Sequence, residues 1–177
     1  MTIIKVGGSL YDHPGLGAGL RAYLPTIPGP KVLVPGGGPV ADAVRELDRV
    51  HNLGQGPAHW IALRSLSVTA DFLAHLVRGL AEVEVLDVYT FASADDREPD
   101  ALPHSWSVTS DSLAARVATV RGASRLILLK SVGLPGVSTW EEVARRGVVD
   151  PHFPTLIRSA RFDVEDVNFR DWLEAHA

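Results

Sequence analysis

The sequence contains no cysteine among its 177 residues. This absence excludes a disulfide framework, a thiol nucleophile and a metal site built from thiolates. The sequence also lacks a run of about eighteen apolar residues and a basic segment followed by an apolar one, so we expect a soluble cytoplasmic protein with no membrane partner. Its formal net charge of −4 gives no electrostatic reason to expect a nucleic-acid partner.

Lysine is scarce in this chain. Of the 17 basic residues, only Lys5, Lys31 and Lys130 are lysines, and the others are arginines. Because arginine serves wherever the chain needs an ordinary surface cation, a retained lysine is a candidate for a chemical role. The alternative, that three lysines remain by chance, stays open for each of them. Lys5 is unusual because it lies inside a β-branched run, and a buried strand tolerates a charge only where something compensates it.

Apolar segments alternate with helical patterns along the chain. This alternation favours an α/β protein, a three-layer αβα sandwich with a mainly parallel central sheet. With 46% hydrophobic residues, we expect a single domain over residues 1–177. The expected strands are residues 2–6, 31–35, 83–89, 125–130 and 161–164. The expected helices are residues 16–24, 39–50, 57–80 and 110–120, and residues 93–103 are expected to form an exposed acidic loop.

The longest expected helix, residues 57–80, has two apolar rows. One row runs through Leu63, Leu66, Ala70, Leu73, Val77 and Leu80, and the second through Ile61, Val68, Phe72 and Leu76. A helix that is apolar on two faces is covered on two sides. The sheet is one cover, and the second is either a subunit partner, which predicts a homodimer, or another helix of the same chain.

Glycines follow two of the expected strands. Gly7-Gly8-Ser9 ends the first strand, and Gly36, Gly37 and Gly38 end the second. In a parallel sheet, ligands collect at the carboxyl ends of the strands, where glycines let the backbone approach an anion and helix amino ends present N–H groups to it. With Lys5 and Lys130 beside them, and Ser110 opening a helix at the same edge, these loops predict a polyphosphate site. Tight turns without a ligand are the alternative.

Asp111 lies in the first turn of the helix expected over residues 110–120. It is either a helix cap or a carboxylate that holds the lysine ammonium groups by charge pairing.

Other motifs for nucleotide or metal binding are absent from the sequence. There is no Walker-type loop, and the "GLGAGL" segment ends in leucine where a dinucleotide loop needs glycine, which argues against an oxidoreductase. No histidine spacing is typical of a metal site, so we expect no metal held by the protein alone.

Three segments resemble the amino acid kinase family, which includes acetylglutamate kinase, aspartokinase and uridylate kinase. They are "IIKVGGSL", "VLVPGGG" and "VTSDSLAA". Within the family, "HSWSVTSDSLAARVA" and "AHWIALRSL" are similar to a branch of methanofuran biosynthesis that phosphorylates an aminomethyl-furan-methyl phosphate. The resemblance implies ATP as donor, Mg2+ on its phosphates and a small-molecule phosphate acceptor.

The resemblance also implies roles for individual residues. Lys5 stabilises charge on the transferred phosphoryl group, and Asp111 orients the lysine side chains. The backbone N–H groups of Gly7, Gly8, Gly37 and Gly38 contact the phosphates. Phosphoryl transfer chiefly needs in-line positioning and neutralisation of negative charge, which these groups would provide.

The chain departs from the family pattern in two places. After the fourth strand, where relatives carry acidic residues, it reads "LKSVGLPG". Many relatives also have a late lysine, and this chain has Thr155 at the corresponding position. Either Lys130 supplies the missing charge and the protein is a kinase, or the protein is a non-catalytic member that binds a nucleotide or oxyanion as partner of an active paralogue.

Overall fold

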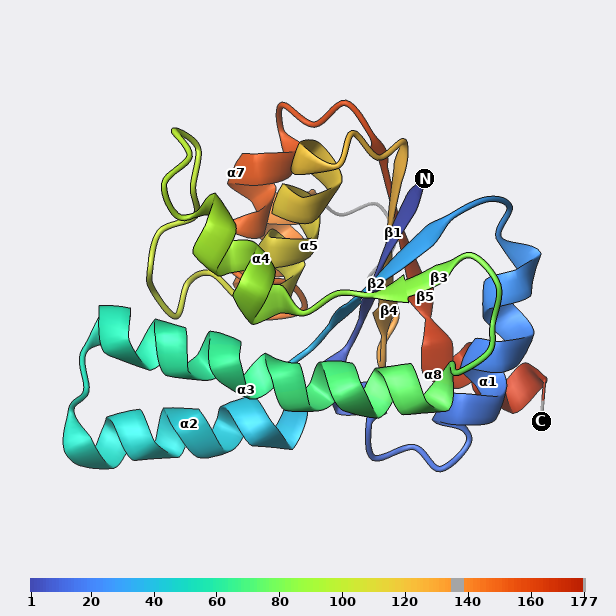
Figure 1. Cartoon of the computed structure of the whole chain (residues 1–177), viewed down its shortest axis with the longest axis horizontal. Coiled ribbons are helices and arrows are strands. Elements are labelled where there is room, and N and C mark those ends of the chain that lie inside the picture. The colour runs from blue at the N-terminus through green and yellow to red at the C-terminus, as the bar shows by residue number, and fades with distance from the viewer. Residues whose placement is uncertain (135–138, 177) are drawn as a thin grey trace.

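The computed structural model describes residues 1–134 and 139–176 of the chain. Within these residues, five strands form one parallel sheet in the order β3-β2-β1-β4-β5 (Figure 1). The order places β1 at the centre, with Lys5 beside Val34 of β2 and Leu128 of β4. The strands are β1 (Thr2–Val6), β2 (Lys31–Pro35), β3 (Val83–Val85), β4 (Arg125–Lys130) and β5 (Asp163–Asn168).

Helices cover both faces of the sheet, which confirms the predicted three-layer αβα sandwich (Figure 1). One face packs its side chains, such as Ile3 and Leu126, against α5 (Ser110–Val120) and α7 (Phe153–Ile157). The other face packs Ile4 and Ile127 against α1 (Leu16–Tyr23) and α8 (Phe169–Ala175). The central strands are apolar on both faces because a parallel sheet is buried on both. These helices are α1 (Leu16–Tyr23), α4 (Val88–Asp95), α5 (Ser110–Val120), α6 (Trp140–Arg145), α7 (Phe153–Ile157) and α8 (Phe169–Ala175).

Two further helices, α2 (Gly38–His51) and α3 (Gln55–Leu76), form an antiparallel hairpin near the carboxyl ends of the strands (Figure 1). The turn between them uses left-handed backbone at Asn52, with φ of 50°, and a positive φ of 86° at Gly54. Short 3-10 helices, η1 (Gly8–Leu10) and η2 (Leu24–Thr26), complete the described elements. The hairpin therefore forms one wall at the sheet edge where ligands bind in such folds.

The two apolar rows of α3 differ in burial. In the first row, Leu63, Leu66, Ala70 and Leu73 are buried, as is Val77 just beyond the helix. In the second row, Ile61 is 43%, Val68 58% and Phe72 40% exposed. The described part of the chain thus leaves these three residues open to solvent, whereas Leu76 packs partly buried against the core, and the homodimer stays a prediction.

Four predicted boundaries are wrong. The helix expected over residues 57–80 begins at Gln55 and ends at Leu76. The strand expected over residues 83–89 ends at Val85, because the Asp87 carboxylate accepts a hydrogen bond from the Thr90 amide and caps α4. The acidic segment from residue 93 is not wholly an exposed loop, since Asp95 ends α4 and forms a buried ion pair with Arg116. The last strand occupies Asp163–Asn168 rather than residues 161–164.

Among the described residues, none of the helices is long and apolar enough to cross a bilayer.

Candidate active site

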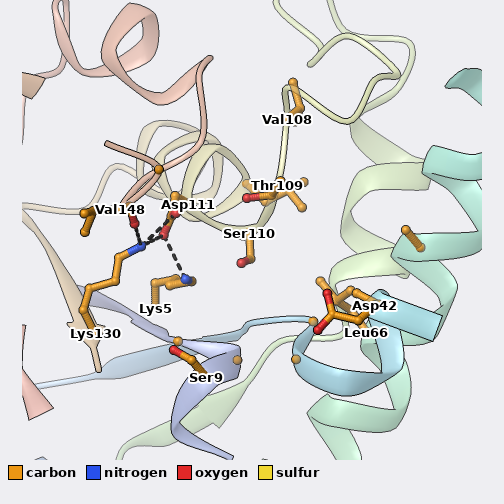
Figure 2. Close-up of a pocket in the computed structure, with 18 of the residues that line it drawn as sticks. Lys5, Ser9, Asp42, Leu66, Val108, Thr109, Ser110, Asp111, Lys130 and Val148 are labelled. Atoms are coloured by element: carbon orange, nitrogen blue, oxygen red, sulfur yellow. Dashed lines mark hydrogen bonds and ion pairs between the residues drawn. The ribbon is translucent and has the colours of Figure 1, made fainter. Parts of the chain in front are cut away.

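A cavity of about 480 Å3 opens at the carboxyl ends of β1, β2 and β4 (Figure 2). Its walls come from the glycine loops, the α2–α3 hairpin, the amino end of α5 and residues 146–148. Of the predicted site residues, those that line the cavity are Lys5, Gly7, Gly8, Ser9, Gly37, Gly38, Ser110, Asp111 and Lys130. Gly36 does not line it. Segments that lie far apart in the sequence therefore meet around this cavity.

Asp111 joins the two lysines at one side of this cavity (Figure 2). Its Oδ1 lies 2.9 Å from Lys5 Nζ and 2.8 Å from Lys130 Nζ. Lys130 Nζ also donates to Asp111 Oδ2 at 2.9 Å and to the Val148 carbonyl at 2.6 Å. All three charged side chains are at least nine-tenths buried, with exposures of 7%, 6% and 8% for Lys5, Asp111 and Lys130.

The electrostatics of this trio leave one positive charge in excess. Burial alone would raise the pKa of Asp111, but the charges of Lys5 and Lys130 outweigh burial and hold that pKa below its ordinary value. Burial, together with the charge of Lys5, lowers the pKa of Lys130 to about 8. The trio pairs one carboxylate with two amines. A buried excess cation beside a cavity favours an anionic ligand.

Asp111 does not cap α5. The amides of the N-cap residue Thr109 and of Ser112 in the first turn donate instead to the carboxylate of Asp150, each at 2.9 Å. Since the backbone has another acceptor, the Asp111 carboxylate is left to pair with Lys5 and Lys130.

The two glycine loops pack backbone against backbone. A Cβ on Gly8 would lie 2.2 Å from the backbone nitrogen of Gly38, and one on Gly36 would lie 2.4 Å from that of Gly8. Gly38 also has a φ of 54°, which side chains disfavour. These glycines therefore bring the ends of β1 and β2 together, and Gly36 serves that contact rather than the cavity.

Some glycine amides are already hydrogen-bonded within the protein, and others lie at the start of a helix. The Gly7 amide donates to the Leu129 carbonyl at 2.9 Å, so it is already engaged within the sheet. Gly8 and Gly38 are the first residues of η1 and α2. The first amides of a helix have no acceptor within that helix, which makes them suited to an anion. Ser9 in η1 and Ser131, which directly follows β4, are joined by a 2.8 Å hydrogen bond between their hydroxyls.

Several residues that line or support the cavity escaped the sequence analysis. Asp42, Arg45 and Trp106 form the wall opposite the lysines, and Figure 2 shows Asp42 across the space from Asp111. Asp42 and Arg45 lie one turn apart directly after the glycine loop, a position that could have identified them. Thr155, at the place of the late lysine, is exposed on α7 and does not line the cavity.

Comparison with known proteins supports the fold and suggests a chemistry. No protein-family model matches the sequence. The uridylate kinase of Archaeoglobus fulgidus superimposes with a TM-score of 0.65 and 15% identity, covering 99% of this chain and 95% of that one. The chain has the amino acid kinase fold. The (5-(aminomethyl)furan-3-yl)methyl phosphate kinase of Methanocaldococcus jannaschii is 25% identical over 96% of this chain and 88% of its own length.

A partial match is to a protein of a different activity. The holo-(acyl-carrier-protein) synthase of Clavibacter michiganensis is 36% identical over 80 residues, which are 44% of this chain and 66% of that protein. Because this match leaves more than half of the chain uncovered, the amino acid kinase fold rests on the alignments that span it. On that fold, the stretch "LKSVGLPG" after β4 differs from the acidic family pattern, and its Pro135 and Gly136 lie outside the described residues.

We predict that Gly8→Ala destabilises the protein, because the added Cβ would meet the backbone of Gly38 rather than a flexible side chain. The free energy of unfolding should fall by about 1–3 kcal/mol, the usual cost of overpacking. Gly56→Ala is the matched control, since its added Cβ has open space. It should be neutral or stabilise by up to about 1 kcal/mol. Urea unfolding measures both, and equal effects would refute the close backbone contact.

Proposed function

We propose that the protein is an ATP-dependent phosphotransferase that acts on a small phosphate monoester. The observation that carries the proposal is the pairing of two buried lysines with Asp111 at the edge of a cavity lined by the glycine loops. The fold supports a kinase, and the similarity to the Methanocaldococcus phosphate kinase supports the acceptor class. The specific acceptor we propose is an aminomethyl-furan-methyl phosphate of a methanofuran-type pathway.

The cavity suits the phosphates of a nucleotide. Gly8, Gly37 and Gly38 line it, and a side chain at Gly8 would collide with the facing loop. Backbone nitrogens and the Lys5 amine therefore offer donors at short range to a chain of phosphate oxygens. We propose that Ser9 and Ser110, which also line the cavity, add hydroxyl donors to the same anion.

Magnesium fits only as a companion of the nucleotide. Among the described residues, no group of three histidine, aspartate or glutamate side chains could hold a metal ion. The carboxylate nearest the phosphate site, Asp111, is occupied by Lys5 and Lys130. Mg2+ commonly takes its ligands from substrate phosphates and water, and the proposal needs no protein cage for it.

When bound, MgATP would supply the phosphoryl group that an acceptor oxygen attacks in line, with ADP as the leaving group. The protein's part is electrostatic. Within residues 1–134 and 139–176, Lys5 pairs with one carboxylate, Asp111, and lies on the cavity side of it (Figure 2), so its amine can stabilise charge on the transferred group. Lys130 adds a second charge beside it and takes the place of the absent late lysine. Asp111 keeps both amines fixed before substrate arrives.

The acceptor side is the wall formed by α2 and Trp106. Arg45 lies over the Trp106 ring at 5.1 Å, and the Trp106 Nε1 donates to Asp48 at 2.7 Å. Asp42 pairs with Arg45 at 2.9 Å in an exposed ion pair, which contributes little to stability and opens easily. This wall presents a cation for the acceptor phosphate, an aromatic face for a ring and a carboxylate for an amine.

The same proposal includes a cytoplasmic location and a homodimer. The composition supports the first. The exposed row of Ile61, Val68 and Phe72 on α3 supports the second, because a partner subunit would cover it.

A non-catalytic nucleotide- or oxyanion-binding protein is the alternative. The observation that favours it is Thr155, whose exposed side chain supplies no charge to the cavity. Such a protein would be stabilised by ATP without transferring a phosphoryl group. A ligand at a hundred times its dissociation constant stabilises a fold by about 2.7 kcal/mol, which a thermal shift detects.

We predict that the purified protein forms ADP from MgATP and an aminomethyl-furan phosphate, and that Lys5→Ala lowers kcat by about 10²–10³-fold because one preorganised charge is lost. Lys31→Ala is the matched control. Its amine is also buried, but it donates to the Ile27 carbonyl, and Lys31 begins β2 at the opposite edge of the sheet. Coupled ADP detection measures all three proteins.

Two outcomes would count against this prediction. If ATP raises the melting temperature but no phosphate monoester yields ADP, the non-catalytic alternative replaces it. If Lys5→Ala binds ATP and turns over as well as the wild type, the proposed role of Lys5 is wrong.

A second prediction concerns the acceptor. Arg45→Gln should raise the KM for the phosphate monoester by about tenfold, the loss of one charge-assisted hydrogen bond, and leave the KM for ATP unchanged. Arg49→Gln is the control, because Arg49 lies on the same helix, pairs with Glu46 and does not line the cavity. An equal rise for both substrates in Arg45→Gln would contradict an acceptor site on this wall.

A further inference from the structure

Asp150 is a second buried carboxylate near the site, 5% exposed, and it does not line the cavity. Its Oδ2 accepts hydrogen bonds from the Thr109 amide at 2.9 Å, the Thr109 hydroxyl at 3.0 Å and the Ser112 amide at 2.9 Å. Its Oδ1 accepts from the Ser112 hydroxyl and from the amides of His152 at 3.2 Å and Phe153 at 3.0 Å. Both oxygens are engaged inside the protein.

These donors belong to two helices that lack a cap of their own. Thr109 and His152 occupy the N-cap positions of α5 and α7, and neither side chain accepts a hydrogen bond from its helix. One carboxylate thus satisfies the first amides of both helices and joins their amino ends. Its negative charge also suits the positive end of the α5 dipole.

Both acceptors of the Lys130 amine are attached to this junction. Asp111 directly precedes Ser112, whose amide and hydroxyl Asp150 holds. The Val148 carbonyl, which accepts from Lys130 Nζ at 2.6 Å, lies two residues before Asp150. We infer that Asp150 is a positioning residue that fixes these two acceptors and, through them, holds the Lys130 amine at the cavity.

The reason is geometric. Without the carboxylate, the buried Ser112 amide loses its acceptor and the Phe153 amide keeps only its 3.2 Å hydrogen bond to the Asp150 carbonyl, so the start of α5 must fray or admit water. Hydrogen bonds weaken steeply when their distance and angle depart from the ideal, and Lys130 depends on Asp111 and Val148 together. The structural role of Asp150 in placing the Lys130 amine is independent of the proposed function. Its importance for phosphoryl transfer rests on that function.

The test measures how well each amine is protected from a small acylating reagent. The chain has three lysines, so mass spectrometry of the digested protein reports Lys5, Lys31 and Lys130 separately. In Asp150→Ala, the acylation rate of Lys130 should rise by about tenfold over the wild type, as expected for the loss of one charge-assisted hydrogen bond. Lys31 is the internal reference and should react at an unchanged rate, because its acceptor, the Ile27 carbonyl, lies elsewhere.

Asp87→Ala is the matched control for the loss of a helix cap. The Asp87 carboxylate caps α4 by accepting from the Thr90 amide and also accepts from the Ser67 hydroxyl, and it does not line the cavity. Both variants should lower the melting temperature, but only Asp150→Ala should expose Lys130. Ser112→Ala, which removes one hydroxyl donor to Asp150, is the milder variant if Asp150→Ala does not fold, and should raise Lys130 acylation by a smaller factor.

The readouts separate this inference from the proposed function. Acylation needs no enzymatic activity, so the positioning role can be upheld even if no phosphotransfer is found. If phosphotransfer is found, Asp150→Asn should lower kcat while the KM for ATP stays within about twofold, because a shifted Lys130 affects the transition state more than ground-state binding. Equal acylation of Lys130 in the wild type, Ser112→Ala and any folded Asp150 variant would overturn the inference.

Discussion

The pairing of Asp111 with Lys5 and Lys130 is the interaction on which the candidate site depends. Two ammonium groups buried on adjacent strands would repel each other and lose their hydration, and a single carboxylate removes much of both costs. Because one carboxylate pairs with two amines, the pairing does not neutralise the trio. The remaining positive charge faces a cavity, and it explains why a central apolar strand contains a lysine.

The topology makes this pairing possible. The strand order places β1 between β2 and β4, so residues at their carboxyl ends meet although more than a hundred positions separate Lys5 from Lys130. The glycine contact between Gly8 and Gly38 closes the other side of β1, where a side chain would not fit. The lysines and the helix amino ends therefore share one edge, as the chemistry of a polyphosphate requires.

Strong local signals predicted the strands that form the centre of the sheet. Residues 2–6, 31–35 and 125–130 are apolar because both of their faces are buried, and the scarcity of lysine pointed to Lys5 and Lys130. Asp150 could not be predicted, because it caps a helix that begins forty residues earlier and leaves no local pattern. The end of β3 could not be predicted either, because the apolar run around Asp87 favours one continuous strand, whereas Asp87 caps α4.

The most direct test of the account is a crystal structure of the protein with Mg2+ and a non-hydrolysable ATP analogue. We expect the triphosphate between the loops of Gly8 and Gly37, with the Lys5 amine in contact with a phosphate oxygen while Asp111 still holds Lys130. A triphosphate bound elsewhere, or one at this edge that contacts neither lysine, would show that the paired amines do not form the anion site.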